Sequence, residues 1–160
     1  MKNNHPSIFE KQRWLRKDGL RNWLISLPFS LSVTLTFKKD VSESVAVQQL
    51  DRFSGLLSAQ LYRNRQQRNG KKFSMAAFME LQSSGRIHWH LLLYDGHGDG
   101  RFLLSKAEAS KIILECCKKC SLLGHQFNIQ DINSNNKEKT VLYVTKRAGK
   151  DLENFHEKWL

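Results

Sequence analysis

Proline and cysteine are scarce in this sequence, and long apolar runs are missing. There are two prolines and three cysteines in 160 residues, so we expect neither a proline-rich linker nor a disulfide framework. Cys116, Cys117 and Cys120 stand within about one helical turn, and their odd number favours buried free thiols over a zinc site. No apolar run approaches the roughly 20 residues that cross a bilayer, and the N-terminus lacks a signal-peptide core. We therefore expect a cytoplasmic protein with no membrane contact.

Acidic residues are outnumbered by basic ones. Lys and Arg total 26 against 15 Asp and Glu, which gives a formal net charge of +11. A domain this basic attracts polyanions, of which nucleic acid is the first expectation. The alternatives are a charge excess that only keeps the protein soluble, or an anionic membrane surface as partner. The length suits one domain with a sizeable core, so we expect residues 1–160 to form a single domain.

The N-terminal segment combines tryptophan with lysine and arginine between residues 8 and 25. We predict that residues 1–28 form a helical basic extension packed on the domain. The helix is expected to be interrupted or turned near Gly19 and to end before Pro28. The segment could bind nucleic acid or pack its tryptophans on the domain, and packing is the better interpretation of the aromatic residues.

Four segments alternate between apolar and polar residues, as half-buried strands do. They cover residues 31–37, 71–81, 87–94 and 125–132. Apolar residues at helical spacing predict one helix that begins at Ser42 or Glu43 and another that runs from Ser105 to Gly124. The order strand, helix, strand, strand, helix, strand predicts an α+β fold of the ferredoxin-like or RRM-like type, with an antiparallel sheet and both helices on one face. A further short helix is predicted over residues 139–150.

His88 and His90 share one face of the third predicted strand, because side chains alternate along a strand. A hairpin register centred on Ser84 puts Glu80 directly across from His88. The other strands turn polar side chains to the same face, namely Ser32, Thr34, Thr36, Asn128 and Gln130. A carboxylate beside two imidazoles predicts a site for Mn²⁺ or Mg²⁺, and Zn²⁺ also accepts these ligand types.

Tyr143 and Lys146 lie three residues apart, so they share one side of the last predicted helix. A tyrosine oxygen can attack a phosphate, but its ordinary pKa of about 10 means that a cation or metal must assist. Lys146 can supply this help and hold the phosphate, while the metal would polarise a phosphate oxygen. Together these residues predict phosphodiester transfer, with Tyr143 as the nucleophile.

These motifs resemble those of the HUH endonucleases, especially the rolling-circle replication initiators of phages and plasmids. The stretch Glu80–Leu93 is similar to their metal motif, in which two histidines flank a hydrophobic residue. Tyr143-Val-Thr-Lys146 is similar to their nucleophile motif, and Val33–Phe37 resembles the strand of their first motif. The three motifs stand in the order that the family uses, and the resemblance covers residues 31–150.

The resemblance implies that Tyr143 attacks single-stranded DNA at an origin or hairpin, leaves a 5′-phosphotyrosine link and releases a 3′-hydroxyl. Such nicking and strand transfer initiate the replication of a phage, plasmid or satellite element. One tyrosine in the predicted nucleophile helix implies the single-tyrosine type. The sequence has no Gly-x-x-x-x-Gly-Lys-Ser/Thr loop, which predicts no helicase domain. A host helicase and replication machinery are therefore expected partners, together with association with the nucleoid through DNA.

Contacts to DNA are expected from the polar sheet face and from basic segments. The candidate residues are Thr34, Thr36, Arg63, Arg65, Arg68, Arg86 and Lys150. Related transposases and mobilisation relaxases use the same chemistry and stay open as alternatives, as does the oligomeric state. A non-catalytic RRM-like module is a further alternative, although it would read bases with aromatic residues where this face offers His, Glu, Ser and Thr. A nucleotide-processing hydrolase with alternating histidines would need a third histidine at Leu92.

Overall fold

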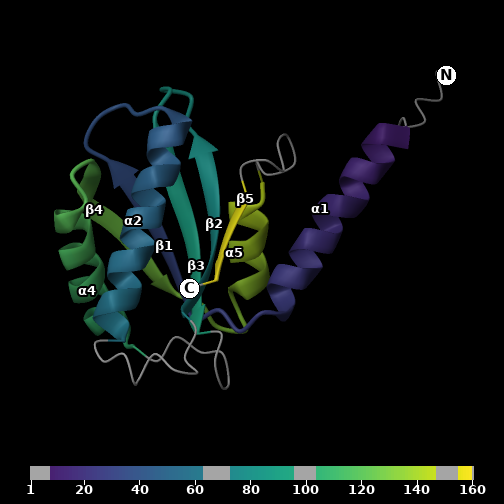
Figure 1. Ribbon diagram of the computed structural model, residues 1–160. Helices are drawn as coiled ribbons and strands as arrows, with labels where there is room; N and C mark the ends of the chain where they lie inside the picture. Colours follow the sequence, from purple (N-terminus) through teal and green to yellow (C-terminus); the bar gives the residue numbers. More distant parts are fainter. Residues whose placement is uncertain (1–7, 63–72, 96–103, 147–154, 160) are drawn as a thin grey trace.

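The computed structural model describes residues 8–62, 73–95, 104–146 and 155–159 (Figure 1). The elements in chain order are α1 (Ile8–Ser26), β1 (Leu31–Phe37), α2 (Glu43–Leu61), β2 (Phe73–Leu81), β3 (Ile87–Asp95), α4 (Lys106–Lys119), β4 (Leu123–Asp131), α5 (Lys137–Val144) and β5 (Phe155–Trp159). None of the helices in these ranges combines the length and apolar character that crossing a lipid bilayer requires.

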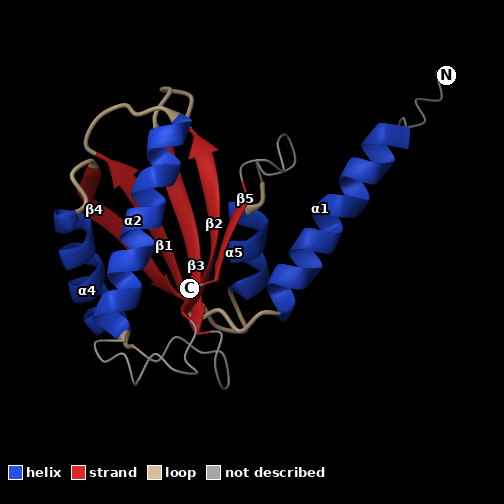
Figure 2. Ribbon diagram, in the orientation of Figure 1, coloured by secondary structure: helices blue, strands red, loops and turns tan. Residues whose placement is uncertain are grey.

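The strands form one antiparallel sheet in the order β4-β1-β3-β2-β5 (Figure 2). The first four strands, with α2 and α4, have the βαββαβ order of a ferredoxin-like fold, which confirms the predicted α+β class. The fifth strand, β5, was not predicted. It pairs with the outer edge of β2, where Phe155 lies opposite Phe78, so the sheet continues beyond the four strands that alternation revealed.

Helices α2 and α4 cover one face of the sheet with an apolar core (Figure 1). Strand alternation points Val33, Leu35, Trp89 and Leu91 to this side, and each of these side chains is buried. The indole of Trp89 donates its N–H to the backbone carbonyl of Ala46 in α2, at 3.2 Å. The burial of such large side chains is the main stabilising contribution to the fold.

The three cysteines belong to this core, and the prediction of buried free thiols is confirmed. Burial raises the pKa of Cys116 to about 11 and that of Cys117 to about 12. Burial also raises the pKa of Cys120. Since the thiolate is the reactive form of cysteine, these three side chains are chemically quiet at neutral pH.

The predicted starts of both core helices are confirmed by their caps. Ser42 accepts a hydrogen bond from the backbone N–H of Val45 at 3.4 Å, and Ser105 forms a capping box with Glu108. The predicted end of the second helix at Gly124 is wrong. Helix α4 ends at Lys119, and Gly124 lies in β4. A Cβ atom there would stand 2.6 Å from the Thr36 hydroxyl oxygen, so this glycine allows β1 and β4 to approach closely.

The opposite face of the sheet has a polar part and an apolar part. The apolar part is a second buried cluster in which Phe78 and Leu92 of the sheet meet Leu24 of α1 and Val141 and Val144 of α5. Helix α5 therefore packs across this face, on the side away from α2 and α4 (Figure 1). It begins two residues before the predicted residue 139 and ends at Val144.

Helix α1 runs without a break through Gly19, so the predicted interruption is wrong. A single glycine costs a helix only about 1 kcal/mol, which neighbouring residues can offset. The last turns of α1 pack on the second cluster through Leu24, which is fully buried. The N-terminal turns of α1 extend away from the sheet (Figure 1).

Candidate active site

The hairpin of β2 and β3 sets the geometry of the site. Glu80 lies directly opposite His88, and Thr34 of β1 lies opposite His90, so the predicted register is confirmed. Gly85 turns the chain between the strands with a φ of 82°, a left-handed conformation that favours glycine. The carboxylate and both imidazoles therefore belong to adjacent strands on one face of the sheet.

Glu80 and His90 are in direct contact. The Nε2 atom of His90 is 2.6 Å from the Oε2 atom of Glu80, and the Nδ1 atom of His90 is 3.2 Å from the Thr34 hydroxyl. The His90 side chain is buried, and partners on both ring nitrogens fix the orientation of its ring. Because a hydroxyl can either donate or accept, Thr34 can satisfy either tautomer of the imidazole.

His88 has a different partner. Its Nδ1 atom is 3.1 Å from the side-chain Nε2 atom of Gln82, whose amide can donate to this ring nitrogen. Burial lowers the pKa of His88 below its ordinary value, and the adjacent His90 lowers it further. Both effects favour the neutral imidazole, which is the form that coordinates metals. Sequence reasoning missed Gln82, although its position two residues after Glu80 places it on the same face of the hairpin.

Glu80, His88 and His90 are ligand types that suit a divalent metal, but the three side chains do not converge on one point. Within the described ranges, no group of three or more His, Cys, Asp or Glu side chains is arranged to hold a metal ion. Neighbouring ligands of an octahedral Mg²⁺ lie about 3 Å apart, so the 2.6 Å contact between Glu80 and His90 needs only a small separation. Side chains bound to the Nδ1 atoms of both histidines orient the rings in the way that metal sites use. Glu80, His88 and His90 therefore fit a divalent metal by their chemistry. To bind one ion together, His88 would have to turn toward Glu80 and His90.

Tyr143 of helix α5 lies beside His90, which is paired with Glu80. Its ring lies edge-on to the His90 ring, with centroids 5.4 Å apart and planes at 87°. The side chain is 62% exposed, so it adds little to the core and is open to a large substrate. The structure thus brings Tyr143 of α5 beside His90 of β3, which lies more than fifty positions earlier in the chain and contacts Glu80 of β2.

A cavity of about 430 Å³ lies between α5 and the polar part of the sheet. This volume is within the range of small-molecule binding sites. Its lining residues are Ser32, Thr34, His90, Asn128, Gln130, Asn136, Lys139, Thr140 and Tyr143. Sequence reasoning named the sheet residues but missed Asn136, Lys139 and Thr140. The available signal was the spacing of Lys139 and Thr140, four and three residues before Tyr143 on the same side of the helix.

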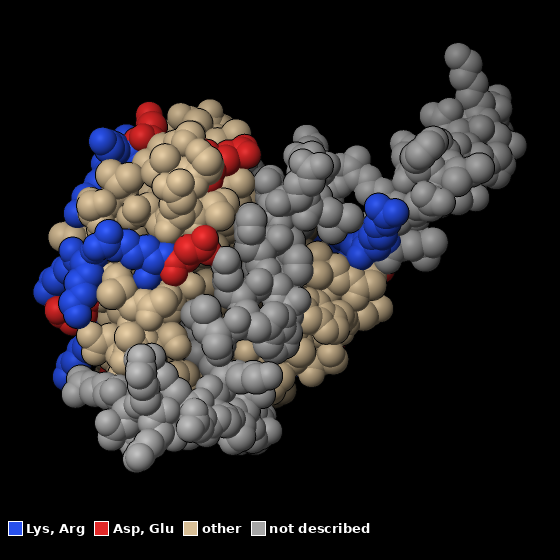
Figure 3. Space-filling model, in the orientation of Figure 1, with Lys and Arg blue, Asp and Glu red and all other residues tan. Residues whose placement is uncertain are grey.

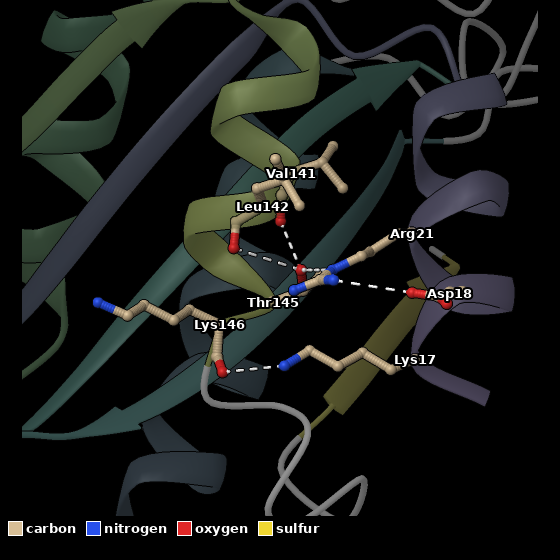
Figure 4. A network of polar contacts seen from close by, with 7 residues as sticks. All are labelled: Lys17, Asp18, Arg21, Val141, Leu142, Thr145 and Lys146. Carbon is tan, nitrogen blue, oxygen red and sulfur yellow. Dashed lines mark hydrogen bonds and ion pairs between the residues drawn. The ribbon is translucent and has the colours of Figure 1, made fainter. Parts of the chain in front are cut away.

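Lys146 lies just beyond the end of α5. Its backbone N–H donates to the carbonyl of Tyr143 at 3.2 Å, and its side chain is exposed. In Figure 4 this side chain points away from α1. Lys139, and not Lys146, is the lysine that lines the cavity in the described part of the chain.

The predicted DNA-contact residues have several different surroundings. Thr36 donates its hydroxyl to the carbonyl of Gln126 at 2.9 Å, while Arg86 pairs with Asp40 at 3.3 Å on the surface. Four candidates lie outside the described residues, namely Arg63, Arg65, Arg68 and Lys150. Basic side chains also gather on the α4 side of the helix-covered face (Figure 3). Positive charge therefore extends beyond the face that carries the candidate site.

Comparison with known proteins agrees with these motifs. The family model described as Replication-associated protein ORF2 matches residues 30–152, which includes β1, the hairpin and α5. No curated protein and no solved structure gives a significant match. The matched family consists of rolling-circle replication initiators of the HUH superfamily, and the match covers most of the chain. The chain therefore belongs to the Replication-associated protein ORF2 family.

Proposed function

We propose that this replication-associated protein nicks single-stranded DNA at a replication origin, with Tyr143 as the nucleophile. The contact between the Tyr143 and His90 rings is the observation that carries the proposal. It places an exposed phenol beside a paired carboxylate and imidazole, at the edge of a cavity with a polar lining. A nucleophile held next to phosphate-binding groups is the arrangement that phosphoryl transfer requires.

In the proposed reaction, the Tyr143 oxygen forms a bond to phosphorus while the bond from phosphorus to the 3′-oxygen breaks. The phenol gives up its proton, and the departing 3′-oxygen takes one up. The products are a 5′-phosphotyrosine and a 3′-hydroxyl that can prime DNA synthesis. Because one phosphodiester replaces another, the reverse reaction can rejoin the strand. Nicking and strand transfer are therefore two directions of one step.

Two lysines have separate proposed roles near this step. Lys139 lines the cavity one helical turn before Tyr143, so its ammonium group is available to a phosphate there. Lys146 follows α5 and would neutralise a phosphate outside the cavity. Glu80, His88 and His90 would hold Mn²⁺ or Mg²⁺, which when bound would polarise a non-bridging phosphate oxygen.

Replication initiation is favoured over the related activities by the family match, because transposases and relaxases share the chemistry but not this family. The non-catalytic alternative is opposed by the positions of the aromatic residues. Phe78 and Tyr94 are on the relevant face of the sheet, but both are buried in the second cluster. They cannot offer the exposed stacking surfaces on which RRM-type binding depends.

The test is trapping of the covalent intermediate. The full chain is incubated with Mn²⁺ and a labelled pool of random single-stranded oligonucleotides, and adducts are separated on a denaturing gel. The wild-type protein should form an adduct, and sequencing the trapped DNA would give the nicked site. Tyr143→Phe should form none while it still binds DNA, and Tyr62→Phe is the matched control that should keep the adduct. An adduct of normal yield in Tyr143→Phe would assign the nucleophile to another residue.

A further inference from the structure

Helix α1 contacts the helix that carries Tyr143, although α1 lies before the segment that matches the family model. Leu24 of α1 is fully buried in the same cluster as Val141 and Val144 of α5. Helix α5 is thus placed between the sheet on one side and the last turns of α1 on the other. An element outside the family segment therefore contributes to the surroundings of the candidate nucleophile.

Arg21 makes the most specific contact between the two helices (Figure 4). Its Nε–H donates to the Thr145 hydroxyl at 3.0 Å, and that hydroxyl donates in turn to the Val141 carbonyl at 2.7 Å. Thr145 is fully buried, so water does not compete for this hydrogen bond at its acceptor. Asp18 lies 3.7 Å from Arg21 and helps to orient the guanidinium group.

Lys17 makes a second contact at the same place (Figure 4). Its ammonium group donates to the backbone carbonyl of Lys146 at 3.2 Å. Lys17 and Arg21 are one turn apart on α1, so both cations reach the C-terminal end of α5, where the helix dipole is negative. Helix α5 has no basic residue in its own last turn. Lys17 and Arg21 therefore bring positive charge from α1 to this end of the helix.

The length of α5 makes these contacts consequential. It has eight residues, and an isolated helix so short is unstable in water. Its N-terminal end is held by Asn136, whose side-chain amide donates to the Asp131 carbonyl at 2.8 Å. Tyr143 belongs to the last turn, which is the turn that Arg21 and Lys17 hold.

We propose that Arg21 and Lys17 are positioning residues. Their contacts to Thr145 and Lys146, called the latch below, hold the last turn of α5 and so keep Tyr143 beside His90. Without the latch, the last turn of α5 frays and the phenol spends less time near the carboxylate–histidine pair. The expected effect on cleavage rests on the proposed function. The expected effect on the helix does not, because it follows from the contacts alone.

The test compares Arg21→Ala with Arg16→Ala in the full chain. Arg16 is an exposed residue of the same helix, so its replacement removes the same charge without touching α5. Hydrogen exchange is measured at the amides of Thr145 and Lys146, which bond to the Val141 and Tyr143 carbonyls. Arg21→Ala should speed their exchange about tenfold, as expected when a hydrogen bond from a charged donor is lost. Arg16→Ala should leave it unchanged.

The cleavage rate at saturating DNA supplies the second measurement. Arg21→Ala should lower kcat by up to about tenfold, because the fraction of protein with Tyr143 in place falls by no more than the opening of the helix end rises. KM should change little, because these contacts position the nucleophile and do not bind DNA. Thr145→Val removes the acceptor and should match Arg21→Ala, whereas Thr145→Ser keeps the hydroxyl and should preserve the rate. The double variant Arg21→Ala/Thr145→Val should be no slower than either single variant, since both changes break one contact.

Two results would overturn the latch. One is unchanged exchange in Arg21→Ala, together with weaker DNA binding and a smaller salt dependence, which would make Arg21 a phosphate contact. The other is a cleavage rate that falls equally in Thr145→Val and Thr145→Ser. If the wild-type protein forms no DNA adduct, the proposed function fails, and the exchange measurement still decides whether α1 holds α5.

Discussion

Neighbouring residues of β3 lie in opposite surroundings on the two faces of the sheet. Trp89 and Leu91 point under α2 and α4, where they are fully buried in the main core. His90, between them, points to the other face and meets Glu80, Thr34 and Tyr143. One strand therefore supplies the main core and the candidate site at alternate positions, so the two roles can be changed separately by mutation.

The face that carries the site is not uniform along its length. Its polar part faces the cavity, whereas its apolar part binds α5 through Val141 and Val144. The same helix that brings Tyr143 to the histidines thus depends on apolar packing a short distance away. In β3 the site residues and the main-core residues lie on opposite faces of the sheet. In α5 the candidate nucleophile and the packing residues lie on one short helix.

The largest effect is expected from His90→Ala. Loss of this imidazole removes a proposed metal ligand and the ring beside Tyr143. Mutation of a residue that only hydrogen-bonds to a metal ligand already lowers activity about ten- to hundredfold, so loss of the ligand itself should lower the cleavage rate more than about hundredfold. The measurement is adduct formation over a titration of Mn²⁺, with a thermal melt to show that the protein stays folded. Full activity in this variant would exclude the site and remove the distinction between the two faces.

Leu91→Ala tests the other face at the next residue. Leu91 is fully buried, so its truncation should lower the free energy of unfolding by about 2–5 kcal/mol. Urea unfolding followed by circular dichroism measures the change. Under conditions where the variant is folded, its cleavage rate should match that of the wild type. A loss of less than about 1 kcal/mol, or slow cleavage by the folded variant, would show that the faces are not independent.

Thr34→Val should give a smaller and more selective effect. The Thr34 hydroxyl orients the His90 ring, so its loss should weaken Mn²⁺ binding about ten- to hundredfold. Thr36→Val is the matched control, because Thr36 bonds to the Gln126 carbonyl and contacts neither histidine in the described structure. Calorimetric titration with Mn²⁺ in the absence of DNA compares the two. Equal affinities would mean that Thr34 does not orient a metal ligand.

The sheet and the centre of the site could be predicted because alternation is a local property. Each strand shows its two faces in its own residues, and the two-residue period fixed the pairing of Glu80 with His88. The same period placed Thr34 and His90 on one face, and in the sheet these two residues lie opposite each other. Strand β5 was missed because its five residues are too few to show a clear period and pairing with β2 decides their conformation.

The approach of the helices to the site could not be predicted from local patterns. The position of Lys139 in the cavity depends on how α5 docks on the sheet, and this docking is decided by residues far away in the chain. The bond from Arg21 to Thr145 spans 124 positions and leaves no periodic trace in the sequence. Helical spacing could show which residues accompany Tyr143, but not which of them face the histidines.

The quiet thiols of the main core make this protein convenient for site-selective labelling. Cys116, Cys117 and Cys120 are fully buried, so a reagent in solution cannot reach their sulfur atoms, and burial also raises the pKa of Cys117 to about 12. A maleimide dye therefore has no reactive native partner in the folded chain. A cysteine introduced at the exposed Asn22 of α1 would be the sole site of attachment, so fluorescence could follow this helix in solution without first replacing any natural cysteine.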